Sequence, residues 1–87
     1  MIVVNSRGEL KNLINRRIEE RGLNCDLNDI DVSRIRNMRE LFIGSNFNGD
    51  ISQWDVSGVK RAKRKTGMRD MFKGSPLANN KPEWCDR

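Results

Sequence analysis

The residues whose types could do chemistry are concentrated in a basic run between Lys60 and Lys73. This stretch holds seven Lys or Arg residues and one acidic residue, whereas the rest of the chain holds ten basic and eleven acidic residues. The net charge of +5 therefore arises in one segment and describes a local patch. Clustered Lys and Arg side chains contact phosphates and steer acidic partners through their electric field. The run predicts binding to an acidic macromolecule.

Side chains for catalysis or metal binding are scarce. The chain has no histidine and only two cysteines, so the common zinc sites lack ligands, and serine–histidine or cysteine–histidine hydrolysis is excluded. Carboxylates could bind a metal or act as an acid and base pair. Most of them fall at repeated positions or in turns, where aspartates usually accept hydrogen bonds from nearby amides. We therefore expect no enzyme, no cofactor and no metal site. The carboxylates considered are Asp26, Asp29, Asp31, Asp50 and Asp55.

An internal repeat provides the framework for the basic run. Residues 30–47 read IDVSRIRNMRELFIGSNF, and residues 54–77 read WDVSGVKRAKRKTGMRDMFKGSPL. The Asp-Val-Ser triplets match at an offset of 24 residues, and Phe42 matches Phe72 at an offset of 30. The difference is a six-residue insertion, which falls within residues 60–67. A period of this length is typical of stacked supersecondary units that present a binding surface.

Local signals predict an N-terminal β-α unit. Residues 1–4 are β-like, and Ser6 and Glu9 have the spacing of a capping box. An apolar stripe at helical spacing follows and stops at Gly22. These signals predict a helix over residues 7–21.

Each repeat is also predicted to contain a helix. Apolar residues from Ile35 to Phe42 are spaced i, i+3, i+6 and i+7, and the second repeat follows the same plan from Asp55 to Phe72. Pro82 suits a terminal extended segment, because proline blocks further strand pairing. The predicted organisation is a single domain, 1–87, with an N-terminal β-α cap (1–26), a first repeat (27–53), a second repeat (54–76) with the basic insertion (60–67), and a C-terminal cap (77–87).

One repeat unit is specific enough to suggest a family. Residues 47–59 read FNGDISQWDVSGV, and residues 68–74 read MRDMFKG. Together they resemble the repeat of the BspA-like family, the bacterial surface-protein type of leucine-rich repeat. The resemblance covers residues 27–84 and implies an α/β fold, a short leucine-rich-repeat-like solenoid with the β-α cap. It implies ligand or protein binding, in a two-repeat member without an export signal.

The chain is expected to be cytoplasmic. It has no apolar run long enough for a transmembrane helix, and its N-terminus lacks the apolar stretch and cleavage site of a secretory signal. Two cysteines, Cys25 and Cys85, do not make a disulfide framework, so we expect free thiols. The small size suggests an accessory protein of a phage or mobile element that inhibits or modulates a host factor.

The repeat register extends the basic run into a face. It places Arg36 beside Lys60 and Arg39 beside Arg69. The preferred partner is an acidic protein surface. The alternatives are non-specific nucleic-acid binding by the same residues, a solvated loop without function, and self-association through the ends of the stack; no membrane partner is expected. The predicted partner-binding residues are Arg36, Arg39, Lys60, Arg61, Lys63, Arg64, Lys65, Arg69 and Lys73.

Overall fold

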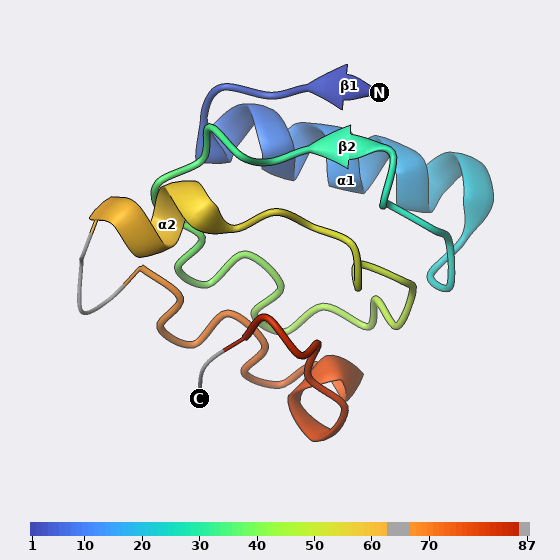
Figure 1. The fold of residues 1–87 in the computed structure, drawn as a ribbon. Coiled ribbons are helices and arrows are strands. Elements are labelled where there is room, and N and C mark those ends of the chain that lie inside the picture. Colours follow the sequence, from blue (N-terminus) through green and yellow to red (C-terminus); the bar gives the residue numbers. More distant parts are fainter. Residues whose placement is uncertain (63–66, 86–87) are drawn as a thin grey trace.

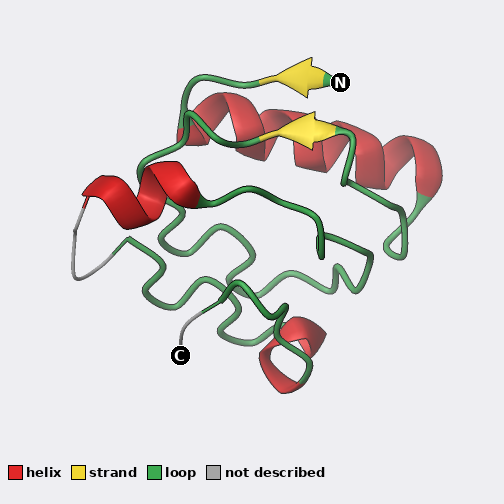
Figure 2. Cartoon of the chain, in the orientation of Figure 1, coloured by secondary structure: helices red, strands yellow, loops and turns green. Residues whose placement is uncertain are grey.

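The computed structural model describes residues 1–62 and 67–85. In Figure 1, the N-terminal strand and helix lie at one end of the molecule, and the turns of residues 67–75 lie toward the other. Most of the chain after the first helix is loop and turn (Figure 2). The elements in chain order are strand β1 (Ile2–Val3), helix α1 (Arg7–Arg21), strand β2 (Ile30–Asp31), helix α2 (Ser57–Ala62) and a 3-10 helix η1 (Pro76–Asn79).

Helix α1 confirms the helix predicted over residues 7–21. The Ser6 hydroxyl accepts a hydrogen bond from the Glu9 amide at 3.2 Å, and Gly22 ends the helix with a φ of 93°. The Glu9 carboxylate reaches one residue further back than in a capping box, and accepts from the Asn5 amide at 2.6 Å. All these contacts are local, which is why the sequence pattern alone predicts the helix.

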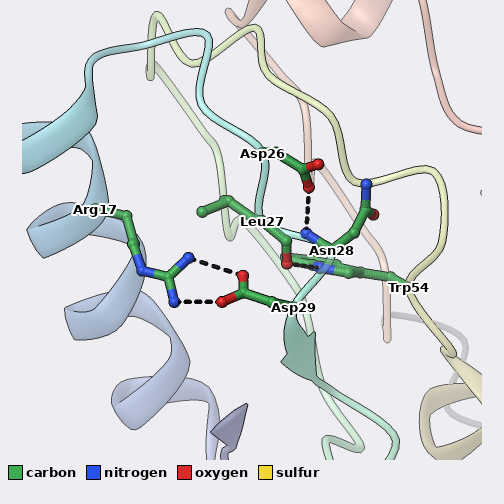
Figure 3. A network of polar contacts seen from close by, with 6 residues as sticks. All are labelled: Arg17, Asp26, Leu27, Asn28, Asp29 and Trp54. Atoms are coloured by element: carbon green, nitrogen blue, oxygen red, sulfur yellow. Dashed lines mark hydrogen bonds and ion pairs between the residues drawn. The ribbon is translucent and has the colours of Figure 1, made fainter. Parts of the chain in front are cut away.

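Arg17 is a buried charged residue of α1, with only 5% of the residue exposed. Its guanidinium donates two hydrogen bonds to the Asp29 carboxylate, at 2.8 and 2.7 Å (Figure 3). This bidentate hydrogen bonding raises the pKa of Arg17 and lowers the pKa of Asp29. The ion pair holds α1 against the segment that leads into β2.

Strand β1 pairs in parallel with β2, with Ile2 opposite Ile30 and Val3 opposite Asp31. Helix α1 makes the crossover between them, as parallel strands require a long connection. A parallel bridge joins Asp26 to Asp50. The segment 26–31 therefore contacts the N-terminal strand through β2 and the end of the first repeat through Asp26.

The segments around Phe42 and Phe72 form two rows of turns that we call the turn ladder, residues 38–45 and 67–75. Within a row, every second amide closes a turn onto the carbonyl three residues back, as Leu41 does to Met38 at 3.2 Å. The other amides of the first row donate across to the second. These bonds run from Met38, Glu40, Phe42 and Gly44 to the carbonyls of Gly67, Arg69, Met71 and Lys73, at 2.7, 2.9, 2.8 and 2.8 Å.

The helix predicted over Ile35 to Phe42 is therefore wrong. Glu40 and Gly44 have φ values of 59° and 66°, and an α-helix cannot pass through such residues. Asp70 and Gly74 repeat these values at 54° and 73°. Among the described residues of the second repeat, the α-helix is confined to α2, which has no counterpart in the first repeat, and η1 follows at the start of the C-terminal cap.

The predicted leucine-rich-repeat-like solenoid is also wrong. Within residues 1–62 and 67–85 there is one two-stranded sheet, and neither strand belongs to the second repeat. Successive strand–helix turns are absent from these residues, because the matching segments meet through turns. The prediction mistook a repeated turn pattern for a repeated helix.

The repeat nevertheless organises the core. Phe42 stacks on Phe47 and Phe72, with ring centroids 5.2 and 5.8 Å apart, and Trp54 stacks on Trp84 at 6.1 Å. The matching between Trp54 and Trp84 extends to their indole N–H groups. These donate to the carbonyls of Leu27 and Ile51, at 2.9 and 2.8 Å.

Candidate functional site

Six of the nine predicted partner-binding residues lie in the described part of the chain, and all six are exposed. Lys63, Arg64 and Lys65 lie outside the described residues. The six fall into two groups, one beside α2 and one along the turn ladder. The first group contains Arg36, Lys60 and Arg61, and the second contains Arg39, Arg69 and Lys73.

A half-open cleft of about 470 Å³ lies between α2 and the segment after β2. We call it the arginine cleft, because Arg34, Arg36 and Arg61 line it together with Ser33, Gly58 and Ala62. The two arginines of the first repeat flank Ile35, which is 1% exposed. Alternation along this segment thus places Ile35 in the core and both arginines in the cleft.

Gly58 allows α2 to approach the first repeat closely enough to form the cleft. A Cβ atom at this position would lie 2.5 Å from the Ser33 carbonyl oxygen and 2.6 Å from that of Ile35. Real Cβ atoms are not found this close to backbone atoms, so the packing requires glycine. The wall of the arginine cleft that α2 forms therefore depends on the absence of a side chain at Gly58.

The carboxylates next to the cleft are held by their own turns. Asp31 accepts hydrogen bonds from the Ser33 hydroxyl and amide, at 2.7 and 2.9 Å, which lower its pKa; the charge of Arg34 adds a smaller effect. Asp55 accepts from the Ser57 amide at 3.0 Å, and its pKa is lowered mainly by that bond. The charge of Arg61 adds a smaller lowering of the Asp55 pKa, but among the described residues neither carboxylate forms an ion pair with an arginine of the cleft.

The arginines of the cleft are available for a ligand. Among the described residues, Arg36 and Arg61 make no hydrogen bond and no ion pair, while Arg34 donates to the Asn5 side-chain oxygen at 3.1 Å. An arginine fork binds a carboxylate or a phosphate through two parallel hydrogen bonds. The lining of the cleft is therefore suited to an acidic group.

Arg34 is the residue that the sequence analysis missed. The repeat register places Arg36 beside Lys60, and in the structure Arg36 lines the cleft together with Arg61 and Arg34. The available signal was the alternation Arg-Ile-Arg immediately after the Asp31–Ser33 turn, which indicates an extended segment with two basic residues on one face.

The second group lies on the turn ladder. Because the Glu40 amide donates to the Arg69 carbonyl, Arg39 and Arg69 occupy matching positions in adjacent rows, as the repeat register predicts. Arg69 makes a 3.7 Å ion pair with Asp70, in which both side chains are exposed, so solvent screens it strongly. This group remains cationic.

Four of the five aspartates considered in the sequence analysis accept hydrogen bonds from the backbone. Asp26, Asp31, Asp50 and Asp55 each accept a hydrogen bond from the amide two residues later, at 2.7 to 3.0 Å. The local hydrogen bonds expected of Asp31, Asp50 and Asp55 are therefore present. Asp29 differs, because it pairs with Arg17 (Figure 3). No group of three potential metal ligands occurs among the described residues.

In the described part of the chain, no helix has both the length and the apolar character needed to span a bilayer.

Comparison with known proteins identifies a family for the chain. No curated protein and no solved structure matches the chain. A family model described as "Mycoplasma protein of unknown function, DUF285" matches residues 9–84. Because this match spans most of the 87 residues, the chain belongs to the DUF285 family.

Proposed function

We propose that the protein is a non-catalytic binding module that engages an acidic partner through its basic surface, and that the partner is a protein. The observation that carries the proposal is the arginine cleft, where Arg36 and Arg61 are exposed and make no hydrogen bond or ion pair within the described residues. A Glu or Asp side chain of a partner would supply the bidentate acceptor that the cleft lacks.

The preference for a protein over nucleic acid rests on the tryptophans. Single-stranded nucleic acid is held by basic grooves combined with aromatic side chains that stack on bases. Trp54 is 4% exposed, Trp84 is half-buried against it, and both indoles donate to backbone carbonyls. Neither ring is presented to a base. Nucleic acid, bound through phosphates alone, is the second candidate.

The proposal also covers the type of repeat to which the chain belongs and the cellular compartment in which it acts. We propose that the chain is a short BspA-like member of its family, on the residues of its repeat, and that it acts in the cytoplasm as an accessory protein which modulates a host factor by occupancy. The free, buried thiol of Cys25 supports a reducing compartment.

The experiment is an affinity capture from the source cell's lysate, with and without nuclease. The wild-type chain is compared with Arg36→Gln/Arg61→Gln, which removes the two cleft arginines that make no hydrogen bond or ion pair among the described residues. The matched control is Arg16→Gln/Lys81→Gln, which removes the same charge from exposed positions elsewhere. A change of Lys60, Arg61, Lys63, Arg64 and Lys65 to Ala tests the rest of the basic run.

We expect a protein partner that survives nuclease, is lost with the cleft variant and is retained by the control. Recovery of nucleic acid alone would contradict a protein partner and would favour nucleic acid, the second candidate. Equal capture by wild type and all variants would overturn the proposal and leave the basic run as a solvated surface.

A further inference from the structure

The arginine cleft offers more hydrogen-bond donors than a single carboxylate can engage. Arg34, Arg36 and Arg61 all line it, and all three residues are exposed. Among the described residues, Arg36 and Arg61 make no hydrogen bond or ion pair, so each has a complete guanidinium fork. A carboxylate has two oxygens, which one fork occupies in the parallel arrangement. A ligand that engages both arginines in this way needs further acceptor oxygens.

The N-terminal unit holds Arg34 at the cleft. The Arg34 Nη1 atom donates to the Asn5 side-chain oxygen at 3.1 Å, and the Asn5 amide donates to the Glu9 carboxylate at 2.6 Å. Glu9 lies in the first turn of α1. Because Arg34 uses one nitrogen for Asn5, its other N–H groups are left for a ligand. A guanidinium that is already positioned loses less side-chain entropy when a ligand binds.

The aspartates beside the cleft do not occupy these donors. Asp31 accepts from Ser33, and Asp55 accepts from Ser57. Both carboxylates still interact with cleft arginines through charge, and this offsets part of the positive charge of the lining. The choice of ligand therefore depends on the number and arrangement of its acceptor oxygens as well as on its charge.

We infer that the arginine cleft binds the phosphate group of a phosphorylated serine or threonine on the partner protein. A phosphomonoester has three strong acceptor oxygens and a charge of about −1.5 to −2 at neutral pH. These oxygens can accept the forks of Arg36 and Arg61 together and still accept from Arg34, as in other arginine clusters that recognise phosphorylated side chains. The inference rests on the proposed binding function and names the acidic group that the cleft takes.

The phosphodiester of a nucleic acid is a poorer ligand for this cleft. Each phosphate of a nucleic-acid backbone carries one negative charge and has two terminal oxygens, so it matches fewer of the donors. Nucleic acid is also held by grooves that follow successive phosphates along the strand. The arginine cleft is half-open and has a volume of about 470 Å³, which suits one phosphorylated side chain.

The test titrates the isotope-labelled chain with three short peptides and follows binding by NMR. The peptides share a sequence of Gly and Ala and differ at one central residue, which is phosphoserine, Glu or Ser. The phosphoserine peptide should bind about tenfold more tightly than the Glu peptide, because it accepts charge-assisted hydrogen bonds from a second fork. The Ser peptide should not bind. The shifted signals should be those of residues 33–36 and 57–61, which include the lining of the cleft. A short single-stranded oligonucleotide should bind more weakly than the phosphoserine peptide.

Charge variants test the role of the two complete forks. Arg36→Gln/Arg61→Gln should abolish binding of the phosphoserine peptide. Arg16→Gln/Lys81→Gln removes the same charge from exposed positions elsewhere and should retain binding. Circular dichroism of each variant checks that α1 is still folded.

A pair of variants tests whether Asn5 positions Arg34. Asn5→Ala removes the side-chain oxygen that accepts from Arg34 and should weaken binding of the phosphoserine peptide severalfold. Asn5→Asp keeps an oxygen acceptor at this position and should bind more tightly than Asn5→Ala. Equal affinities of these two variants and the wild type would contradict this role of Asn5.

Four results would overturn the inference. These are no binding of the phosphoserine peptide, equal affinity for the phosphoserine and Glu peptides, tighter binding of the oligonucleotide, and undiminished binding by Arg36→Gln/Arg61→Gln. Equal affinity for the phosphoserine and Glu peptides would leave the proposed function in place, because the cleft would still bind an acidic group. Lysate capture that the cleft variant does not reduce would instead contradict the proposed function, and that measurement is independent of the peptides.

Discussion

At the scale of single residues, the recurring feature is an aspartate whose carboxylate accepts hydrogen bonds from a serine two positions later. Asp50 accepts from the Ser52 amide and hydroxyl, at 2.9 and 2.7 Å, and the amide bond is the main reason that its pKa falls to about 2. Because the pKa of Asp50 is lower in the folded chain, the ionised carboxylate stabilises the fold at pH values above its ordinary pKa of 3.8. This stabilisation is lost as the pH falls toward 2. In that window the unfolded chain binds more protons.

We therefore expect Asp50→Asn to unfold with a weaker dependence on pH between 3.8 and about 2 than the wild type. Asparagine keeps the accepting oxygen, so the turn and the stability near neutral pH should be largely retained. Urea midpoints followed by circular dichroism over this pH range provide the measurement. Ser52→Ala removes the hydroxyl donor, so the pH dependence of its urea midpoint should lie between those of the wild type and Asp50→Asn. Equal acid sensitivity of Asp50→Asn and wild type would show that Asp50 does not contribute.

At the scale of elements, two helical glycines should respond in opposite directions to the same substitution. Gly8 in α1 has open space around its Cβ position, so Gly8→Ala should stabilise the chain by about 0.5–1 kcal/mol through helix propensity. Gly58 in α2 faces two backbone carbonyls, so Gly58→Ala should destabilise it by about 1–3 kcal/mol. The free energy of unfolding in urea measures both. Stabilisation by Gly58→Ala would mean that α2 is not packed against the first repeat, and that the arginine cleft is wider than described.

The individual elements also show which parts of the fold could be predicted from the sequence and which could not. The α1 helix follows from contacts within a few residues, such as Ser6 with Glu9, and it was predicted correctly. In the first repeat, Met38 and Phe42 are buried as predicted, but they lie in turns. Their amides bond to residues of the second repeat, and no local pattern records such distant acceptors. The basic face was predicted by composition, whereas its division into a cleft and a ladder depends on those turns and on Gly58.

At the scale of the whole molecule, one apolar core runs from Val4 to Leu77 and joins the N-terminal unit to both repeats. Phe42 lies at its centre, with no exposed surface and with rings of Phe47, Trp54 and Phe72 around it. A shared core of this kind couples elements that are distant in sequence. The chain should therefore unfold in a single cooperative step, although its sequence divides into a cap and two repeats.

Phe42→Leu tests this coupling. The substitution removes two stacked phenylalanine contacts and one with Trp54, and should lower the free energy of unfolding by about 2 kcal/mol. Circular dichroism reports mainly on α1, and fluorescence reports on the stacked Trp54 and Trp84. In urea, both signals should change together in the wild type, and both midpoints should shift equally in the variant. If the fluorescence midpoint alone shifts, α1 and β1 fold independently of the repeats, and the ion pair between Arg17 and Asp29 is only a contact between two units.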